Sequence, residues 1–169
     1  MPKVSPAPPS PGSKKTTPDP DSEAVAGPPT GGWAALAPEL LVTDFAASLA
    51  FWCGILGFAI AYQRPEQSFA YLEREAAQVM LCQRDGQWET APLERPFGRG
   101  VMLQLYFSDI APTLASVRAA GVPVVAGPRE VWRRAGACEA GQREFFVQDP
   151  DGYLLMVAQN IGERPLPMP

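Results

Sequence analysis

A pattern in the first half of the chain returns in the second half and limits what the fold can be. Five residues recur with a constant offset of 65 positions: Asp44, Phe45, Ser48, Leu49 and Ala50 return as Asp109, Ile110, Thr113, Leu114 and Ala115. Each copy opens with an aspartate, whose carboxylate can accept hydrogen bonds from the first amides of a helix. A repeat at this spacing indicates the duplication of one structural unit. The sequence therefore predicts two similar modules in tandem.

Each module is predicted to contain one helix and four strands. In the first copy, apolar residues spaced four, three and four apart form one face of a helix: Phe45, Leu49, Trp52 and Leu56. Gly57 is placed to end this helix in a left-handed conformation. A strand precedes the helix at 36–43, and three strands follow it at 58–64, 68–74 and 77–83.

The second module follows a polar loop at 85–99. Its predicted elements are a strand at 101–107, a helix from Asp109 to Gly121, a strand at about 128–134, and a hairpin with strands at 143–148 and 153–159. The hairpin turns at Asp149-Pro150-Asp151-Gly152, where Asp, Pro and Gly stand at the positions that a type I turn favours. This tetrapeptide predicts two adjacent antiparallel strands.

Three segments together resemble a known family. They are Val42-Thr43-Asp44-Phe45, Phe51-Trp52 with Leu56-Gly57-Phe58, and Arg143-Glu144-Phe145 leading into Asp149-Pro150. Over residues 36–160 the chain resembles the vicinal oxygen chelate superfamily of glyoxalases, extradiol dioxygenases and bleomycin-resistance proteins. Within it, the chain is most similar to bleomycin-resistance-type binding proteins. The resemblance implies an α+β fold in which two tandem βαβββ modules form a curved mixed sheet around a cleft, with the helices outside.

Composition divides the chain into a domain and two tails. Residues 1–32 hold nine of the twenty prolines and almost no bulky apolar side chains, which predicts a disordered tail. The domain is expected at 33–160, with modules at about 36–84 and 100–160, and a C-terminal tail at 161–169.

Charge and cysteine content indicate which partners and which cellular compartment to expect. The formal net charge of −4 argues against a nucleic-acid partner and leaves room for a cationic small molecule, although it serves solubility equally well. No run approaches the ~20 apolar residues that cross a bilayer, and the N-terminus lacks the apolar core of a secretory signal. Three cysteines are an odd number without metal-type spacing, so we expect reduced thiols in a cytoplasmic protein that does not bind membranes.

The resemblance also implies where a metal would bind, and the residues there do not suit one. The family's ligand positions fall on Ala37, Met80, Met102 and Met156, and the chain has no histidine. An alanine and three thioethers are poor ligands for magnesium, manganese, iron or zinc. Copper(I) is the metal that methionines would hold, whereas filling of an apolar cleft floor explains them more simply. We therefore expect no metal, no cofactor and no catalytic residues.

Loss of the metal favours binding over catalysis. The resemblance then implies a metal-free protein that binds and sequesters a small molecule, such as a bleomycin-like antibiotic, and so confers resistance. From the family pattern and from alternation along strands, the predicted ligand-binding residues are Phe69, Tyr71, Glu73, Met102, Gln104, Trp132, Glu144 and Phe146. Each has an alternative role in packing or as a solvated side chain. The family's stacking tryptophan falls on Gly141, a departure for which Trp132 is a candidate replacement.

Two other function classes stay open. A metal-independent enzyme would need a carboxylate such as Glu73 or Glu144, raised in pKa by burial, as its general base. A non-catalytic structural dimer with an unused cleft is the third hypothesis. The partners expected under the binding hypothesis are a cationic, aromatic small molecule and a second copy of the chain. We expect this homodimer because a single chain would expose an apolar cleft to water.

Overall fold

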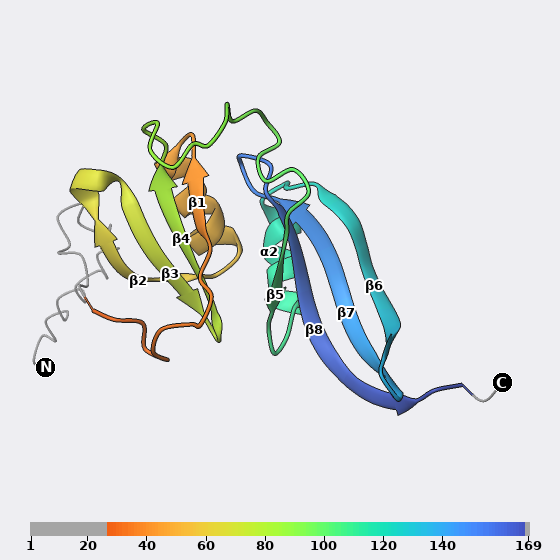
Figure 1. The fold of residues 1–169 in the computed structure, drawn as a ribbon. Helices are drawn as coiled ribbons and strands as arrows, with labels where there is room; N and C mark the ends of the chain where they lie inside the picture. The colour runs from red at the N-terminus through yellow and green to blue at the C-terminus, as the bar shows by residue number, and fades with distance from the viewer. Residues whose placement is uncertain (1–26, 168–169) are drawn as a thin grey trace, which may run out of the picture.

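The computed structural model describes residues 27–167 and contains two four-stranded mixed sheets, one in each module (Figure 1). The first sheet has the order β1-β4-β3-β2, with β1 (Glu39–Val42), β2 (Ala59–Arg64), β3 (Phe69–Arg74) and β4 (Ala77–Gln83). The second has the order β5-β8-β7-β6, with β5 (Met102–Tyr106), β6 (Val124–Ala135), β7 (Cys138–Gln148) and β8 (Leu154–Pro165). In each sheet the first strand runs parallel to the last, and the other pairs are antiparallel. The predicted α+β fold of tandem βαβββ modules is confirmed, but the modules form two separate sheets and not the one curved sheet that the resemblance implied.

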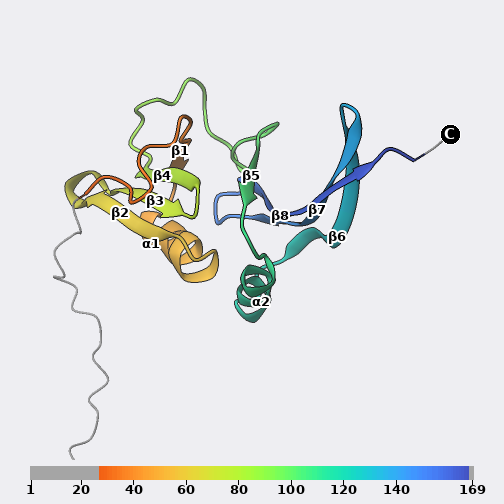
Figure 2. The same cartoon turned by 90° about the horizontal axis from the view of Figure 1, so that it is seen from below.

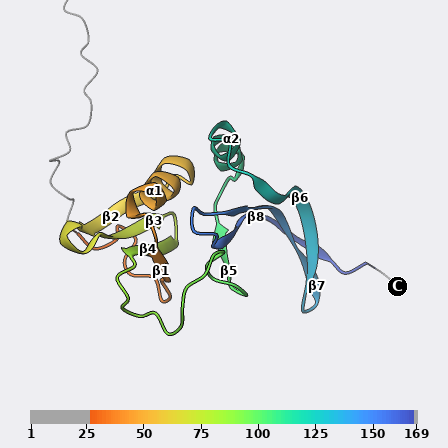
Figure 3. The same ribbon diagram turned by 90° about the horizontal axis from the view of Figure 1, so that it is seen from above.

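The helices of both modules lie on the same side of the molecule (Figures 2 and 3). They are α1 (Phe45–Leu49), which continues as the π-helical turn η1 (Ala50–Ile55), and α2 (Ala111–Ala119); a short 3-10 turn, η2 (Pro65–Gln67), joins β2 to β3. Asp44 caps α1 as predicted, since its Oδ1 accepts a hydrogen bond from the Ala47 amide at 2.9 Å. Asp109 accepts from the Ala111 amide at 2.9 Å, but the N-cap position of α2 belongs to Ile110. The prediction that Asp109 caps this helix was therefore one residue early.

None of the helices described between residues 27 and 167 has the length and apolar character of a membrane span.

One apolar core joins the two modules. It contains Trp52 from the first module and Phe145 from the second, both fully buried. The rings of Phe58 and Phe107 meet edge to face across the modules at 6.0 Å, and the Arg74 guanidinium lies 3.7 Å from the centre of the Phe107 ring. The faces of the sheets that carry the helices are thus used for packing, which leaves the opposite faces for other roles.

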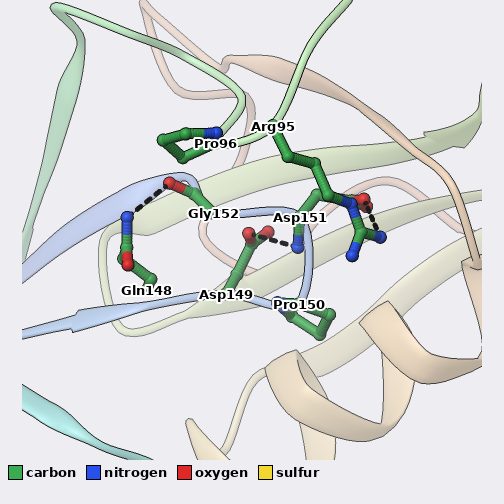
Figure 4. Close-up of a pocket in the computed structure, with 7 residues that line it drawn as sticks. All are labelled: Arg95, Pro96, Gln148, Asp149, Pro150, Asp151 and Gly152. Atoms are coloured by element: carbon green, nitrogen blue, oxygen red, sulfur yellow. Dashed lines mark hydrogen bonds and ion pairs between the residues drawn. The ribbon is translucent and has the colours of Figure 1, made fainter.

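The turn Asp149–Gly152 lies against Arg95 and Pro96 of the loop between the modules (Figure 4). The Gly152 amide donates to the Asp149 carbonyl at 3.0 Å, and Gly152 has a φ of +94°, so the predicted turn is confirmed. Asp151 is almost fully buried and accepts from the Thr43 amide, next to β1, at 2.8 Å. The same carboxylate forms an ion pair with Arg95 at 2.8 Å. A motif read from the sequence as a local turn therefore also joins the modules.

The long strands of the second sheet extend beyond the predicted ones. β7 begins at Cys138 and not at 143, and β8 continues to Pro165, past residue 161, where the C-terminal tail was expected to begin. β6 and β7 are joined at Gly136, which has a φ of +66°. Residues 138–142 have little intrinsic preference for strands, and their pairing with both neighbours in the sheet decides their conformation.

Candidate ligand-binding site

The first sheet presents an aromatic face on the side away from the helices. Along β3, Ala70 and Leu72 belong to the main core, whereas Phe69 and Tyr71 form a separate cluster with Ala61. Four further residues pack against this cluster: Ala37, Tyr62, Met80 and Cys82. We call these seven residues the first face. The structure thus brings together Phe69 and Tyr71, two of the predicted ligand-binding residues.

An N-terminal segment, residues 27–38, contacts the first face. The Trp33 ring meets Tyr71 edge to face at 5.3 Å and Tyr62 at 6.1 Å. The predicted ligand residue Glu73 accepts hydrogen bonds from the Thr30 amide at 3.0 Å and from the Thr30 hydroxyl at 2.9 Å. These contacts begin before residue 32, where the sequence placed the end of the disordered tail. Residues 1–26 of that tail lie outside the described residues.

A cavity of about 640 Å³ opens at one end of the first face. Six of the residues that line it decide its chemistry: Arg64, Phe69, Trp88, Glu39, Glu66 and Asp85. The Arg64 guanidinium lies 3.8 Å from the centre of the Phe69 ring. Three carboxylates against one guanidinium leave these six residues with a net charge of −2. Such a lining suits a flat molecule that carries positive charge.

Trp88 is the aromatic residue of this cavity that sequence analysis did not select. It lies in the predicted polar loop, is 80% exposed, and has a positive φ of +59°. Its ring lines the cavity and is open to stacking with a flat molecule. A lone tryptophan among polar neighbours in the sequence was the available signal.

The second sheet presents a polar face, also on the side away from the helices. On β5, Met102, Gln104 and Tyr106 are exposed, while Leu103 and Leu105 point toward the core. Gln104 donates to the Gln142 side chain at 3.4 Å, and Gln142 donates in turn to the Tyr106 hydroxyl. With their neighbours on the same side of the sheet, these residues form what we call the second face: Met102, Gln104, Tyr106, Arg129, Arg133, Gln142, Glu144, Phe146 and Met156. Four of the predicted ligand residues, Met102, Gln104, Glu144 and Phe146, are brought together here.

Glu144 is fully buried on the second face, where two arginines hold it. Arg133 contacts its two carboxylate oxygens at 2.8 and 2.9 Å, and Arg129 contacts one of them at 2.9 Å. Hydrogen bonds from Arg133, and then from Arg129, hold the pKa of Glu144 below its ordinary value, although burial acts in the opposite direction. The hypothesis that burial raises the pKa of Glu144 and makes it a general base is therefore wrong.

Trp132 lies apart from the other predicted ligand residues. It pairs with Gly141 across β6 and β7, whereas Arg129 pairs with Glu144, so Trp132 is on the opposite side of the sheet from the second face. A Cβ on Gly141 would lie 2.7 Å from the Trp132 ring, which explains the glycine at the place of the family's tryptophan. The Arg164 guanidinium packs on the same ring at 4.3 Å.

The four positions that correspond to the family's metal ligands are divided between the two faces. Ala37 and Met80 pack on the first face, while Met102 and Met156 lie on the second. Alanine offers no ligand atom, and thioether sulfur does not suit a hard cation, so these residues do not fit the family's metal. Among residues 27–167, no group of three or more His, Cys, Asp or Glu side chains is placed to hold a metal ion either.

Comparisons with known proteins agree with this fold. Residues 33–157 match the model of the Glyoxalase/Bleomycin resistance protein/Dioxygenase superfamily. A search of curated proteins found no match. Among solved structures, a virulence protein from Salmonella typhimurium is similar, with 24% identity over 76% of this chain and 98% of its own, and a TM-score of 0.55.

Two further structures share the fold at lower identity. Lactoylglutathione lyase from Agrobacterium tumefaciens is 18% identical over 78% of this chain and 95% of its own, with a TM-score of 0.50. TioX from a Micromonospora species is 17% identical over 80% of this chain and all of its own, with a TM-score of 0.52. The family match covers most of the chain and agrees with the tandem βαβββ modules. The chain therefore belongs to the glyoxalase/bleomycin resistance protein/dioxygenase superfamily.

Proposed function

We propose that this protein binds and sequesters a small aromatic molecule without a metal, and in this way confers resistance to a bleomycin-like antibiotic. One observation carries the proposal: the metal-ligand positions of the family hold Ala37, Met80, Met102 and Met156, on sheet faces that also carry aromatic side chains. The cavity supplies the exposed ring of Trp88 and negative charge, whereas Phe69 is 1% exposed beneath the Arg64 guanidinium. We further propose a cytoplasmic setting, in agreement with the unpaired thiols of all three cysteines.

The proposal includes a homodimer. The first and second faces belong to different sheets. On the second face, Met102 is 44% exposed and Tyr106 is 47% exposed. A two-fold partner would cover this surface and give each ligand a second wall.

A thermal-shift screen of the full chain tests the proposal. It compares a bleomycin-type glycopeptide, flat aromatic cations, neutral aromatics and divalent metal ions. A ligand at 100 times its Kd adds roughly 2.7 kcal/mol to the free energy of unfolding. We expect an aromatic compound to raise the melting temperature and the metals to leave it unchanged. Stabilisation by a divalent metal alone would contradict metal-free sequestration.

Trp88→Ala provides the matched variant for this screen. Because Trp88 is 80% exposed, its truncation should leave the melting temperature of the unliganded protein almost unchanged. If the ligand stacks on this ring, its binding should weaken by ~1–2 kcal/mol. If this variant binds the ligand with wild-type affinity, the ligand does not bind in the cavity beside the first face.

A further inference from the structure

The charge on the second face is opposite to that expected from the sequence. Glu144 was a candidate partner for a cationic ligand, yet its carboxylate is fully buried and already contacts two guanidinium groups. Two arginines and one glutamate leave this group of three side chains with a net charge of +1. A cation placed here would meet the two guanidinium groups before it reached the carboxylate.

The two arginines retain donors for a further partner. Their side chains are 51% and 47% exposed, for Arg129 and Arg133 respectively, while Glu144 beneath them is 0% exposed. Within the described part of the chain, the Arg129 Nη1 and the Arg133 Nε make no hydrogen bond. The buried carboxylate fixes both guanidinium groups on one face, and their remaining N–H groups are available at its surface. Planar guanidinium groups held in this way suit the oxygens of carboxylates and phosphates.

The surroundings of this pair are partly apolar. The Arg129 guanidinium lies 5.5 Å from the centre of the Phe146 ring, and the exposed side chains of Met102 and Tyr106 belong to the same face. Gln142 accepts from Arg133 at 3.1 Å and donates to Tyr106, so polar and aromatic groups are held in one network. A ligand that combined an anionic group with an aromatic body would match both parts.

We propose that Arg129 and Arg133 form an anion-binding site on the second face, which takes a carboxylate or phosphate group carried by an aromatic molecule. Glu144 acts in this site as a positioning residue that orients the two arginines. The inference rests on the proposed function, because it assigns the charge of a group on the ligand that the protein is proposed to bind.

Calorimetric titration of the full chain with three matched probes tests the site: 2-naphthoate, 2-naphthyl phosphate and 2-naphthylmethylammonium. We expect both anions to bind, and the more tightly bound of the two identifies the preferred anionic group; binding of the cation should not depend on Arg129 or Arg133. Arg133→Met and Arg129→Met should each weaken binding of the anions at least tenfold. The affinity of Arg133→Lys for the anions should fall between those of wild type and Arg133→Met, since lysine keeps the positive charge but lacks the paired N–H donors of the guanidinium group.

Arg143→Met is the control variant. Arg143 precedes Glu144 on β7 and is similarly exposed, at 48%, but it pairs with Glu130 on the opposite side of the sheet. Anion binding should be unchanged in this variant. If Arg133→Met does not fold, Arg129→Met and Arg133→Lys carry the comparison.

Two results would overturn the anion site: absence of binding by both anions, or equal losses of anion binding in Arg143→Met and Arg133→Met. The proposed function fails separately. Binding of the cation without binding of either anion would refute the anion site and leave aromatic sequestration standing, whereas absence of binding by any aromatic compound would refute both.

Discussion

Two buried acidic residues of this protein show how the surroundings of a carboxylate decide its charge. Glu144 contacts two arginines, and its pKa lies below the ordinary value. Asp149 is 5% exposed, and burial raises its pKa from 3.8 to about 6, despite hydrogen bonds from the Tyr153 amide and the Trp52 indole. The first carboxylate is therefore ionised at neutral pH with strong partners, while the second is ionised at a cost in stability.

The raised pKa of Asp149 predicts how stability depends on pH. The folded state binds a proton more readily than the unfolded state, so the contribution of Asp149 to stability grows as pH falls from 7 toward 4 and is lost as pH rises through about 6. Between pH 7 and pH 5 this group should add about 1 kcal/mol to the free energy of unfolding. Urea denaturation of wild type and Asp149→Asn at both pH values measures the difference. An equal pH dependence in the two proteins would show that Asp149 is not responsible.

For single helices, strands and turns, the sequence predicted the features that residues close together in the chain determine. The Asp44 cap, the turn at Asp149–Gly152 and the alternation that separates Phe69 from Leu72 all depend on residues close in the chain. The arginine site could not be predicted in this way, because it depends on the register of β6 against β7, which places Arg129 opposite Glu144. An arginine on a strand is most often a solvated residue, and nothing near it in the sequence identifies its partner.

The contact of Thr30 with the first sheet was missed for a related reason, because the sequence placed Thr30 in the disordered tail. Trp33 contacts Tyr62 and Tyr71, and Thr30 contacts Glu73, across more than 25 residues of chain. Proline-rich composition correctly marks a segment that has little core of its own. It gives no information about packing against a sheet that the segment itself does not form.

The turn between β7 and β8 allows a direct test of its glycine. Gly152 has a φ of +94°, and a Cβ there would lie 2.6 Å from the Pro96 Cβ, whereas Gly162 has a φ of +107° with nothing within 4 Å. Gly162→Ala should therefore lose roughly 1–3 kcal/mol through backbone strain alone. Gly152→Ala should lose a further ~1–3 kcal/mol, because Pro96 must also move. Chemical denaturation of both variants measures the difference, and equal losses would mean that the contact with Pro96 is easily relieved.

At the scale of the whole molecule, one shared core holds the two modules together and leaves both remaining sheet faces for binding. The first face carries aromatic rings beside a cavity with negative charge, and the second carries two arginines on a buried glutamate. The two faces therefore differ in charge, negative beside the first and positive on the second. This arrangement explains why no single stretch of sequence specifies the site.

The proposed homodimer is tested by light scattering of the full chain. We expect a particle of twice the 18.2 kDa chain mass at micromolar concentration. Met102→Glu should shift the protein toward the monomer, since it places a charge on an exposed apolar part of the second face. Val125→Glu, at a 55% exposed position on β6, is the control and should leave the mass unchanged. A monomeric wild type would contradict the dimer.

Calorimetry tests whether the protein binds the proposed aromatic ligand without a metal. The full chain is treated with EDTA, dialysed and titrated with the best compound from the thermal-shift screen, in the presence and absence of added manganese, zinc or copper(I). Because Ala37, Met80, Met102 and Met156 stand at the family's ligand positions, we predict the same Kd in every titration, within a factor of two. Loss of binding after EDTA treatment, restored by one of these metals, would contradict the account.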